Sequence, residues 1–145
     1  PRSTPKPSSA ASDVYKRQGR KMKTAKDYLE EANKVVKKID VNKAIEIHKN
    51  KSAIFIDVRD SSDIAKTGSI EGSLKIQRGL IEFVADEGTE FYNDNLQKDS
   101  EIILVCGAGG QAALTGKTLI DMGYENVLNV GAIGDWEKNG GPISR

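Results

Sequence analysis

The stretch EIILVCGAGGQAAL, residues 101–114, decides the fold. Residues 101–106 form the strongest strand pattern in the chain, an apolar and β-branched run that predicts a buried strand. The turn that follows holds three glycines in four residues. Residues 111–124 then have the apolar spacing of a helix that ends at Gly123. A strand that turns directly into a helix is the repeating unit of an α/β domain with a parallel sheet.

Further strand and helix patterns alternate around this unit. Strands are expected at residues 52–59, 73–77 and 127–130. Helices are expected at residues 24–39, 41–49, 79–87 and 134–140, with a short one near Ile64. This alternation indicates an α/β domain whose parallel sheet is covered by helices on both faces.

The chain divides into three parts. Residues 1–21 are rich in Pro, Ser, Lys and Arg without apolar periodicity, so they are expected to be disordered. The segment SSAASDVYKRQ within them looks like translated adaptor or vector sequence, so this tail is expected to be non-native and the native start to be Met22. An N-terminal helix is expected within residues 22–40, followed by one domain over residues 41–145.

Charge and apolar patterning exclude several classes of function. The formal net charge is +1, but the tail holds six basic residues and one acid, whereas the remainder holds 16 basic and 20 acidic residues. A weakly acidic domain argues against nucleic-acid binding. No apolar run approaches the roughly 20 residues of a membrane helix, and no export signal is visible. A cytoplasmic location away from membranes is therefore expected.

The chain has one cysteine, Cys106, and one histidine, His48. One cysteine cannot form an internal disulfide, and this pair is too few for a cysteine-rich zinc site. Neither a metal nor a cofactor is expected. His48 is expected to be either a solvated histidine or a histidine at the C-terminal end of a helix, and not a metal ligand.

The turn after Cys106 favours a negatively charged sulfur. Ligands of open α/β sheets bind beyond the carboxyl ends of the strands. Three glycines allow successive N–H groups to form an anion-binding nest, and the following helix points its positive end at the same spot. These groups stabilise a thiolate. The alternatives are a structural cysteine that ends a strand and a nucleotide-phosphate loop, although the turn lacks the lysine and hydroxyl residue of a P-loop.

Several separated motifs make the chain resemble the single-domain rhodanese-like sulfurtransferases over roughly residues 40–142. The matching segments are IDVRD (56–60), GSIEGSLKI (68–76), QRGLIEF (77–83), the Cys106 loop, AALTGKTLIDMGYENV (112–127), and Trp136 followed by Gly140-Gly141-Pro142. The resemblance implies a five-stranded parallel sheet flanked by helices. It also implies that Cys106 accepts sulfane sulfur as a persulfide and passes it on.

The resemblance assigns roles to individual residues. The loop residues Gly107, Ala108, Gly109, Gly110 and Gln111 would hold the sulfur. Asp57 with Arg59 would brace the loop, and the alternative for them is an ordinary ion pair at the end of a strand. Arg78 is a separate candidate for a cationic wall near the pocket, and the alternative for it is a solvated surface arginine. The donor would be thiosulfate or a persulfide, and the acceptor a thiol, a cyanide-like nucleophile or a protein.

Three departures from the family pattern bear on the chemistry. Gln111 stands where the loop commonly has an arginine, Ser69 stands where a histidine is usual after Gly68, and Gly131-Ala132 replaces a glycine pair. A neutral amide at residue 111 lacks the bidentate fork that suits an oxyanion such as thiosulfate. A catalytically weak binding or redox-sensing module therefore remains an alternative to the enzyme. A phosphatase or arsenate reductase is less favoured, since those relatives use a loop one residue longer.

Overall fold

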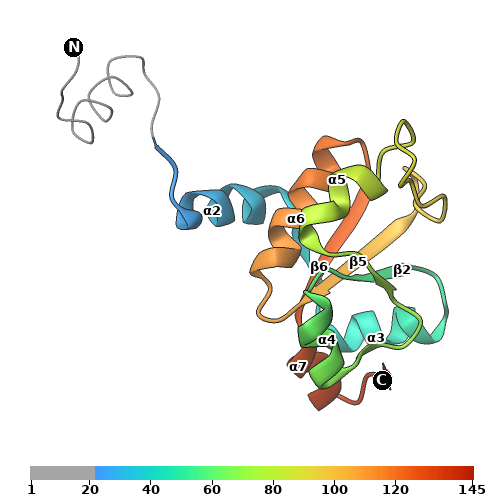
Figure 1. Cartoon of the computed structure of the whole chain (residues 1–145). Helices are drawn as coiled ribbons and strands as arrows, with labels where there is room; N and C mark the ends of the chain where they lie inside the picture. The colour runs from blue at the N-terminus through green and yellow to red at the C-terminus, as the bar shows by residue number, and fades with distance from the viewer. Residues whose placement is uncertain (1–21) are drawn as a thin grey trace, which may run out of the picture.

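The computed structural model describes residues 22–145, so the expectations for residues 1–21 lie outside the described residues. Its centre is a five-stranded sheet in which all neighbouring strands run parallel (Figure 1). The strand order is β1-β6-β5-β2-β4. The strands are β1 (Lys37–Lys38), β2 (Ile54–Asp57), β4 (Leu74–Lys75), β5 (Glu101–Cys106) and β6 (Asn126–Ala132). The predicted five-stranded parallel sheet is confirmed.

Helices cover both faces of the sheet, as predicted. The helices α5 (Ile81–Val84) and α6 (Gly110–Asp121) lie over one face, and α3 (Val41–Lys49) and α7 (Ile133–Lys138) lie over the other (Figure 1). Side chains alternate along β5, so that Ile102, Leu104 and Cys106 join the core under α6. Ile103 and Val105 join the opposite core. The strand is therefore apolar throughout because both of its faces are buried.

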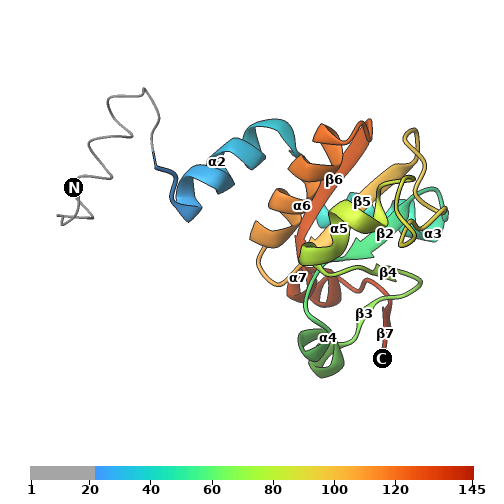
Figure 2. The same cartoon turned by 45° about the horizontal axis from the view of Figure 1, so that its top comes forward.

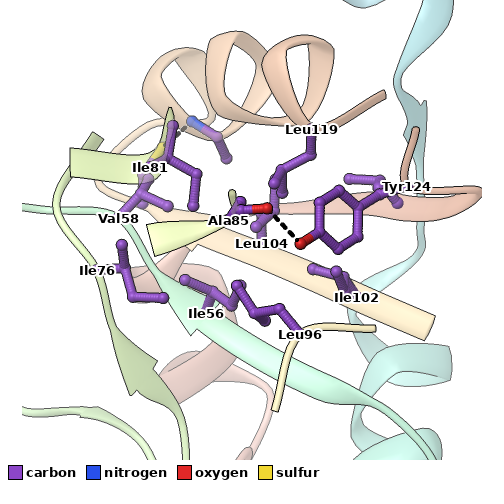
Figure 3. Packing of buried hydrophobic residues seen from close by; sticks show 13 residues of the cluster. Ile56, Val58, Ile76, Ile81, Ala85, Leu96, Ile102, Leu104, Leu119 and Tyr124 are labelled. Carbon is purple, nitrogen blue, oxygen red and sulfur yellow. Dashed lines mark hydrogen bonds between the residues drawn. The ribbon is translucent and has the colours of Figure 1, made fainter. Parts of the chain in front are cut away.

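The core under α6 is built from aliphatic side chains of β2 and β5 against α5 and α6 (Figure 3). Tyr124, which follows α6, closes this core. Its hydroxyl group donates a hydrogen bond of 2.8 Å to the carbonyl oxygen of Ala85, at the end of α5 (Figure 3). Tyr124 is 2% exposed, and its burial raises the pKa of the phenol to about 12.

Trp136 of α7 fills the opposite core. It is fully buried, and its Nε1–H donates to the carbonyl oxygen of Pro142 at 3.0 Å. His48 lies edge-on to both Phe55 and Trp136, and its Nε2 is 2.7 Å from the carbonyl oxygen of Glu71. His48 lies in the last turn of α3, as expected, and is partly buried instead of freely solvated. His48 packs in an aromatic cluster and joins α3 to the turn at residue 71.

The N-terminal segment is shorter as a helix than the sequence predicts. The helix α2 (Ala25–Val35) begins at a Thr24–Asp27 capping box, and residues Lys37–Lys38 then form β1 at the edge of the sheet. α2 packs against α6 (Figure 2). Val36 packs closely against Gly116 of α6. A Cβ atom added to Gly116 would lie only 2.8 Å from Cγ1 of Val36. The segment is therefore joined to the domain through the sheet and through α6.

Four short elements complete the fold. β3 (Ser69–Ile70) pairs antiparallel with β7 (Ile143–Ser144), a contact between distant parts of the chain that local patterning does not predict. The helix α4 (Ser61–Thr67) precedes β3, and a 3-10 turn, η1 (Arg78–Leu80), precedes α5. No helix within residues 22–145 is long and apolar enough to cross a membrane.

Candidate active site around Cys106

Cys106 is the last residue of β5, and its side chain faces the core under α6. The residue is 1% exposed, so the sulfur lies beneath the loop and not at its rim. Its Sγ accepts a backbone hydrogen bond of 2.9 Å from Gly109 N–H and a second of 3.4 Å from Ala112 N–H. Two amides at the start of a helix thus converge on one sulfur atom, an arrangement that favours negative charge on it.

The loop reaches this geometry through Gly109. Its φ of +99° lies in the left-handed region, which glycine adopts without strain, and Gly109 is the N-cap of α6. This turn points its N–H group back at the sulfur. Of the residues predicted to hold the sulfur, Gly107 and Ala108 are exposed on the outside of the loop. Ala112, which the prediction did not include, supplies the second donor because α6 begins at Gly110.

Asn129 fixes the loop from the neighbouring strand. Its side chain is buried at 4% exposure and donates from Nδ2 to the carbonyl oxygen of Gly109 at 3.1 Å. Its Oδ1 accepts a hydrogen bond of 2.8 Å from Gly131 N–H, next to an irregularity in the pairing of β5 with β6. One amide side chain therefore joins the Cys106 loop to the end of β6. In the sequence, Asn129 is recognisable as the polar residue inside the otherwise apolar run VLNV, since a buried polar side chain needs a hydrogen-bond partner.

Asp57 and Arg59 form a buried ion pair at the end of β2. Arg59 Nη2 lies 2.8 Å from Asp57 Oδ2, and the two side chains are 5% and 0% exposed. Arg59 also donates to Thr67 Oγ1 at 3.0 Å and to the carbonyl oxygen of Gly68 at 2.9 Å. The hydroxyl group of Ser69 donates to Asp57 Oδ2 at 2.7 Å. The pair holds the turn between α4 and β3.

This ion pair points away from Cys106. Alternation along β2 places Val58 in the same core as Cys106 and turns Asp57 to the other side. In the described part of the chain, no side-chain hydrogen bond of the pair reaches the 106–111 loop. The resemblance implied a brace on that loop, but the contacts brace the α4–β3 turn. Within residues 22–145, the pair is connected to the Cys106 loop through the backbone of neighbouring strands, where Asp57 pairs with Val105 and Val58 N–H donates to the carbonyl oxygen of Val105 at 3.1 Å.

Within residues 22–145, neither Arg78 nor Gln111 makes a hydrogen bond to Cys106. The Arg78 guanidinium lies 3.3 Å from Glu82 and donates to Thr118 of α6 at 3.3 Å. Its charge is therefore paired, and the side chain joins η1 to α6. Gln111 is exposed in the first turn of α6, and its side chain makes no hydrogen bond to the rest of residues 22–145. Neither residue places a free positive charge on Cys106.

Comparison with protein families and curated proteins identifies related sequences. A model of the rhodanese-like domain matches residues 40–139. The adenylyltransferase and sulfurtransferase UBA4 of Candida albicans is 32% identical over 91 residues, which are 62% of this chain and 20% of that protein. The mitochondrial protein HIGH ARSENIC CONTENT 1 of Arabidopsis thaliana is 32% identical over 84 residues, 53% of this chain and 47% of that protein. The chain thus spans at most about half the length of these two relatives.

Solved structures share the fold. A Rhodopseudomonas palustris protein described as a possible tyrosine phosphatase is 32% identical, with a TM-score of 0.80 over 86% of this chain and 96% of its own. The polysulfide-sulfur transferase of Wolinella succinogenes superimposes with a TM-score of 0.64 at 20% identity, over 92% of this chain and 91% of its own. The human single-domain sulfurtransferase TSTD1 gives a TM-score of 0.62 at 18% identity, over 70% and 95%. From the domain match and the shared sheet, the chain belongs to the rhodanese-like domain family.

Proposed function

We propose that this protein is a sulfurtransferase that carries sulfane sulfur as a persulfide on Cys106. The observation that supports this most strongly is the convergence of the Gly109 and Ala112 amides on Sγ. Fixed N–H donors around a sulfur stabilise the thiolate that must attack and the thiolate that must leave. Protein groups alone provide this environment, and no cofactor is needed for the reaction.

The reaction consists of two displacements at sulfur. In the first, the Cys106 thiolate attacks the sulfane sulfur of the donor. A new S–S bond forms to Sγ, and the rest of the donor leaves with the electron pair, as sulfite when the donor is thiosulfate. In the second, a nucleophilic acceptor attacks the outer sulfur, and the electron pair of the broken S–S bond returns to Cys106.

The paired charges at the site favour a persulfide donor over thiosulfate. Thiosulfate is a dianion, and the arginines of the matching segments IDVRD and QRGLIEF, Arg59 and Arg78, are both paired with carboxylates. Gln111 adds no charge. The same absence of a free guanidinium argues against phosphoryl transfer, which needs positive charge on the transferring group. The name of the R. palustris relative is therefore no guide to this site.

A weak, redox-sensing or partner-binding module is the second candidate. The observation in its favour is the 1% exposure of Cys106, which restricts approach to the sulfur. Both candidates require Cys106 as a free thiol. Reducing compartments such as the cytoplasm keep thiols in this form, and the cytoplasmic location stays a prediction.

A turnover assay separates the two candidates. Thiocyanate formation from cyanide should be measured with thiosulfate and with a small persulfide as donors. The sulfurtransferase predicts multiple turnovers with the persulfide, slower turnover with thiosulfate, and none with Cys106→Ser. Sulfur uptake that stops at one equivalent, without turnover, would support the module.

A further inference from the structure

The exposed large apolar side chains of residues 22–145 gather in two segments of the chain. They are Met22, Tyr28 and Val35 in residues 22–38, and Leu80, Phe83 and Phe91 in residues 79–97. All six are 48–63% exposed. Single exposed apolar residues are normal, but groups of them mark surfaces that another molecule covers. We call residues 22–38 the lysine surface and residues 79–97 the acidic surface.

The lysine surface contains a helix with more apolar side chains than α6 covers. Tyr28, Ala32 and Val35 follow the three- and four-residue spacing of one helix face, yet Ala32 is the only buried residue of α2. Tyr28 is 51% exposed and Val35 is 48% exposed. The segment holds five lysines and three acids, for a net charge of +2. One side of α2 is therefore apolar, basic and open.

The acidic surface has the opposite charge. Its five acidic residues are Glu82, Asp86, Glu87, Glu90 and Asp94, and it contains no lysine or arginine. Among the ion pairs within residues 22–145, only that of Glu82 with Arg78 neutralises one of these carboxylates. The segment therefore presents four carboxylates without a cationic partner in the described part of the chain.

Exposed apolar side chains lie among these carboxylates. Leu80 and Phe83 are three residues apart at the junction of η1 with α5, so they share one side of this helical segment. Thr89 ties Phe91 to the same region, because its hydroxyl group donates to the Phe83 carbonyl oxygen and accepts a hydrogen bond of 3.3 Å from Phe91 N–H. Aromatic side chains of this kind are common anchors of protein interfaces.

The two surfaces lie on either side of α6. Both α2 and α5 pack against α6, and α6 lies between them in both views of the molecule (Figures 1 and 2). A two-fold axis along α6 exchanges its two sides, so that α2 of one copy faces the acidic surface of the second copy. The same contact then forms twice and closes the pair.

We propose that two copies of this chain associate with the lysine surface of each on the acidic surface of the other. Opposite charges steer and orient the contact, and the exposed apolar side chains of both surfaces are buried in it. This inference goes beyond the proposed function and involves no sulfur chemistry.

The molecular mass in solution tests whether the pair forms. Sedimentation of the full chain should be measured between about 1 µM and about 1 mM, the range of weak and transient association. A monomer–dimer equilibrium is expected, with a Kd that rises with salt because salt screens the attraction between the surfaces. A monomer over the whole range would overturn a second copy as the occupant, and a Kd that falls with salt would overturn the charge complementarity.

Charge exchange tests which surfaces meet. One variant combines Lys26→Glu with Lys34→Glu, and the other combines Glu87→Lys with Glu90→Lys. Each variant alone should have a Kd at least about fivefold above that of the wild-type chain, because both contacts of the pair then bring like charges together. An equal mixture of the two variants should recover the wild-type Kd within about twofold. In the mixed pair, one contact joins the two altered surfaces and the other joins the two unaltered ones.

Two further variants complete the test. Lys43→Glu combined with Lys66→Glu makes the same change in net charge at exposed residues of α3 and α4, outside both surfaces, and should leave the Kd unchanged. Phe91→Ser should raise the Kd at least about tenfold, because each pair loses two aromatic side chains. Phe91 is 63% exposed, so the thermal unfolding of the monomer should stay the same.

The outcomes separate the possible pairings. A dimer whose Kd is raised by the lysine variant alone and is not recovered by mixing would overturn the proposed contact in favour of α2 against α2. A Kd that the α3–α4 control raises as much as the lysine variant would show that net charge acts and not the surface. Sulfur transfer enters none of these measurements, so their failure leaves the proposed function unaffected.

Discussion

Replacing Asn129 by alanine should both destabilise the fold and weaken the activation of Cys106. The variant removes the hydrogen bond from Nδ2 to the Gly109 carbonyl oxygen and the hydrogen bond that Oδ1 accepts from Gly131 N–H. Gly131 N–H would lose this partner at a site where Asn129 is 4% exposed, whereas the Gly109 carbonyl oxygen would keep the hydrogen bond of 3.0 Å that it accepts from Ala113 N–H. A buried group without a partner costs about 1–3 kcal/mol, so we expect the free energy of unfolding to fall by about 1–3 kcal/mol.

The effect on Cys106 follows from the position of Gly109. Its N–H group donates to Sγ at 2.9 Å, and the loss of the Asn129 contact on its carbonyl oxygen frees the turn to move. A charge-assisted hydrogen bond contributes about 1.5–3 kcal/mol, and we expect the partial loss of one to lower the rate of Cys106 labelling at neutral pH about tenfold. The assay is the rate of Cys106 labelling by iodoacetamide at neutral pH, expressed relative to its plateau at alkaline pH.

Asn126→Ala is the control on the same strand. Asn126 is exposed, and its Nδ2 donates to the Asp99 carbonyl oxygen at 3.3 Å, far along the strand from the loop. Its loss should cost under about 1 kcal/mol and leave the relative labelling rate unchanged. If Asn129→Ala and Asn126→Ala label alike, Asn129 is a structural residue and the account of the loop is wrong.

Three further predictions concern stability and donor use. Burial raises the pKa of Tyr124 from about 10 to about 12, so the protonated phenol stabilises the fold fully below about pH 10, and about 2–3 kcal/mol of stability is lost as the pH rises toward about 12. In denaturant titrations over that pH range, Tyr124→Phe should lose stability less steeply than the wild-type chain. An equal slope would contradict the burial argument. In thermal unfolding, Gly141→Ala should destabilise the fold by about 1–3 kcal/mol, because the added Cβ would overlap the rigid indole of Trp136. Gly134→Ala in α7 meets open space and should be neutral or stabilising in the same assay. Similar values for the two variants would argue against this packing. Gln111→Arg should raise kcat/KM for thiosulfate about 10- to 150-fold if a missing charge limits donor use, and an unchanged value would show that another feature of the loop sets donor choice.

The central part of the fold is predictable from sequence because its signals are local. The run at residues 101–106 is apolar on both faces, and the glycines after it mark the turn into α6. β1 is different. Lys37 and Lys38 continue the helical spacing of the preceding residues, and only pairing with Leu128 and Asn129 makes them a strand. The short β3–β7 pair likewise depends on a contact between distant segments.

The candidate site is predictable in its chemistry but not in its contacts. The cysteine and the glycine turn are visible in the sequence, yet which amides reach Sγ depends on where α6 begins. The direction of Asp57 could have been inferred, since Val58 beside it belongs to the core on the Cys106 side and neighbouring residues of a strand point to opposite faces. The pairing of Arg78 with Glu82 has an i,i+4 signal, whereas its contact with Thr118 has none.

Intact mass spectrometry after incubation with a persulfide donor or thiosulfate shows whether Cys106 carries sulfur. The reduced wild-type chain should gain the mass of one sulfur atom, cyanide should return it to the starting mass, and Cys106→Ser should gain nothing. No gain with either donor, or a gain that survives in Cys106→Ser, would contradict a sulfur carrier built on Cys106.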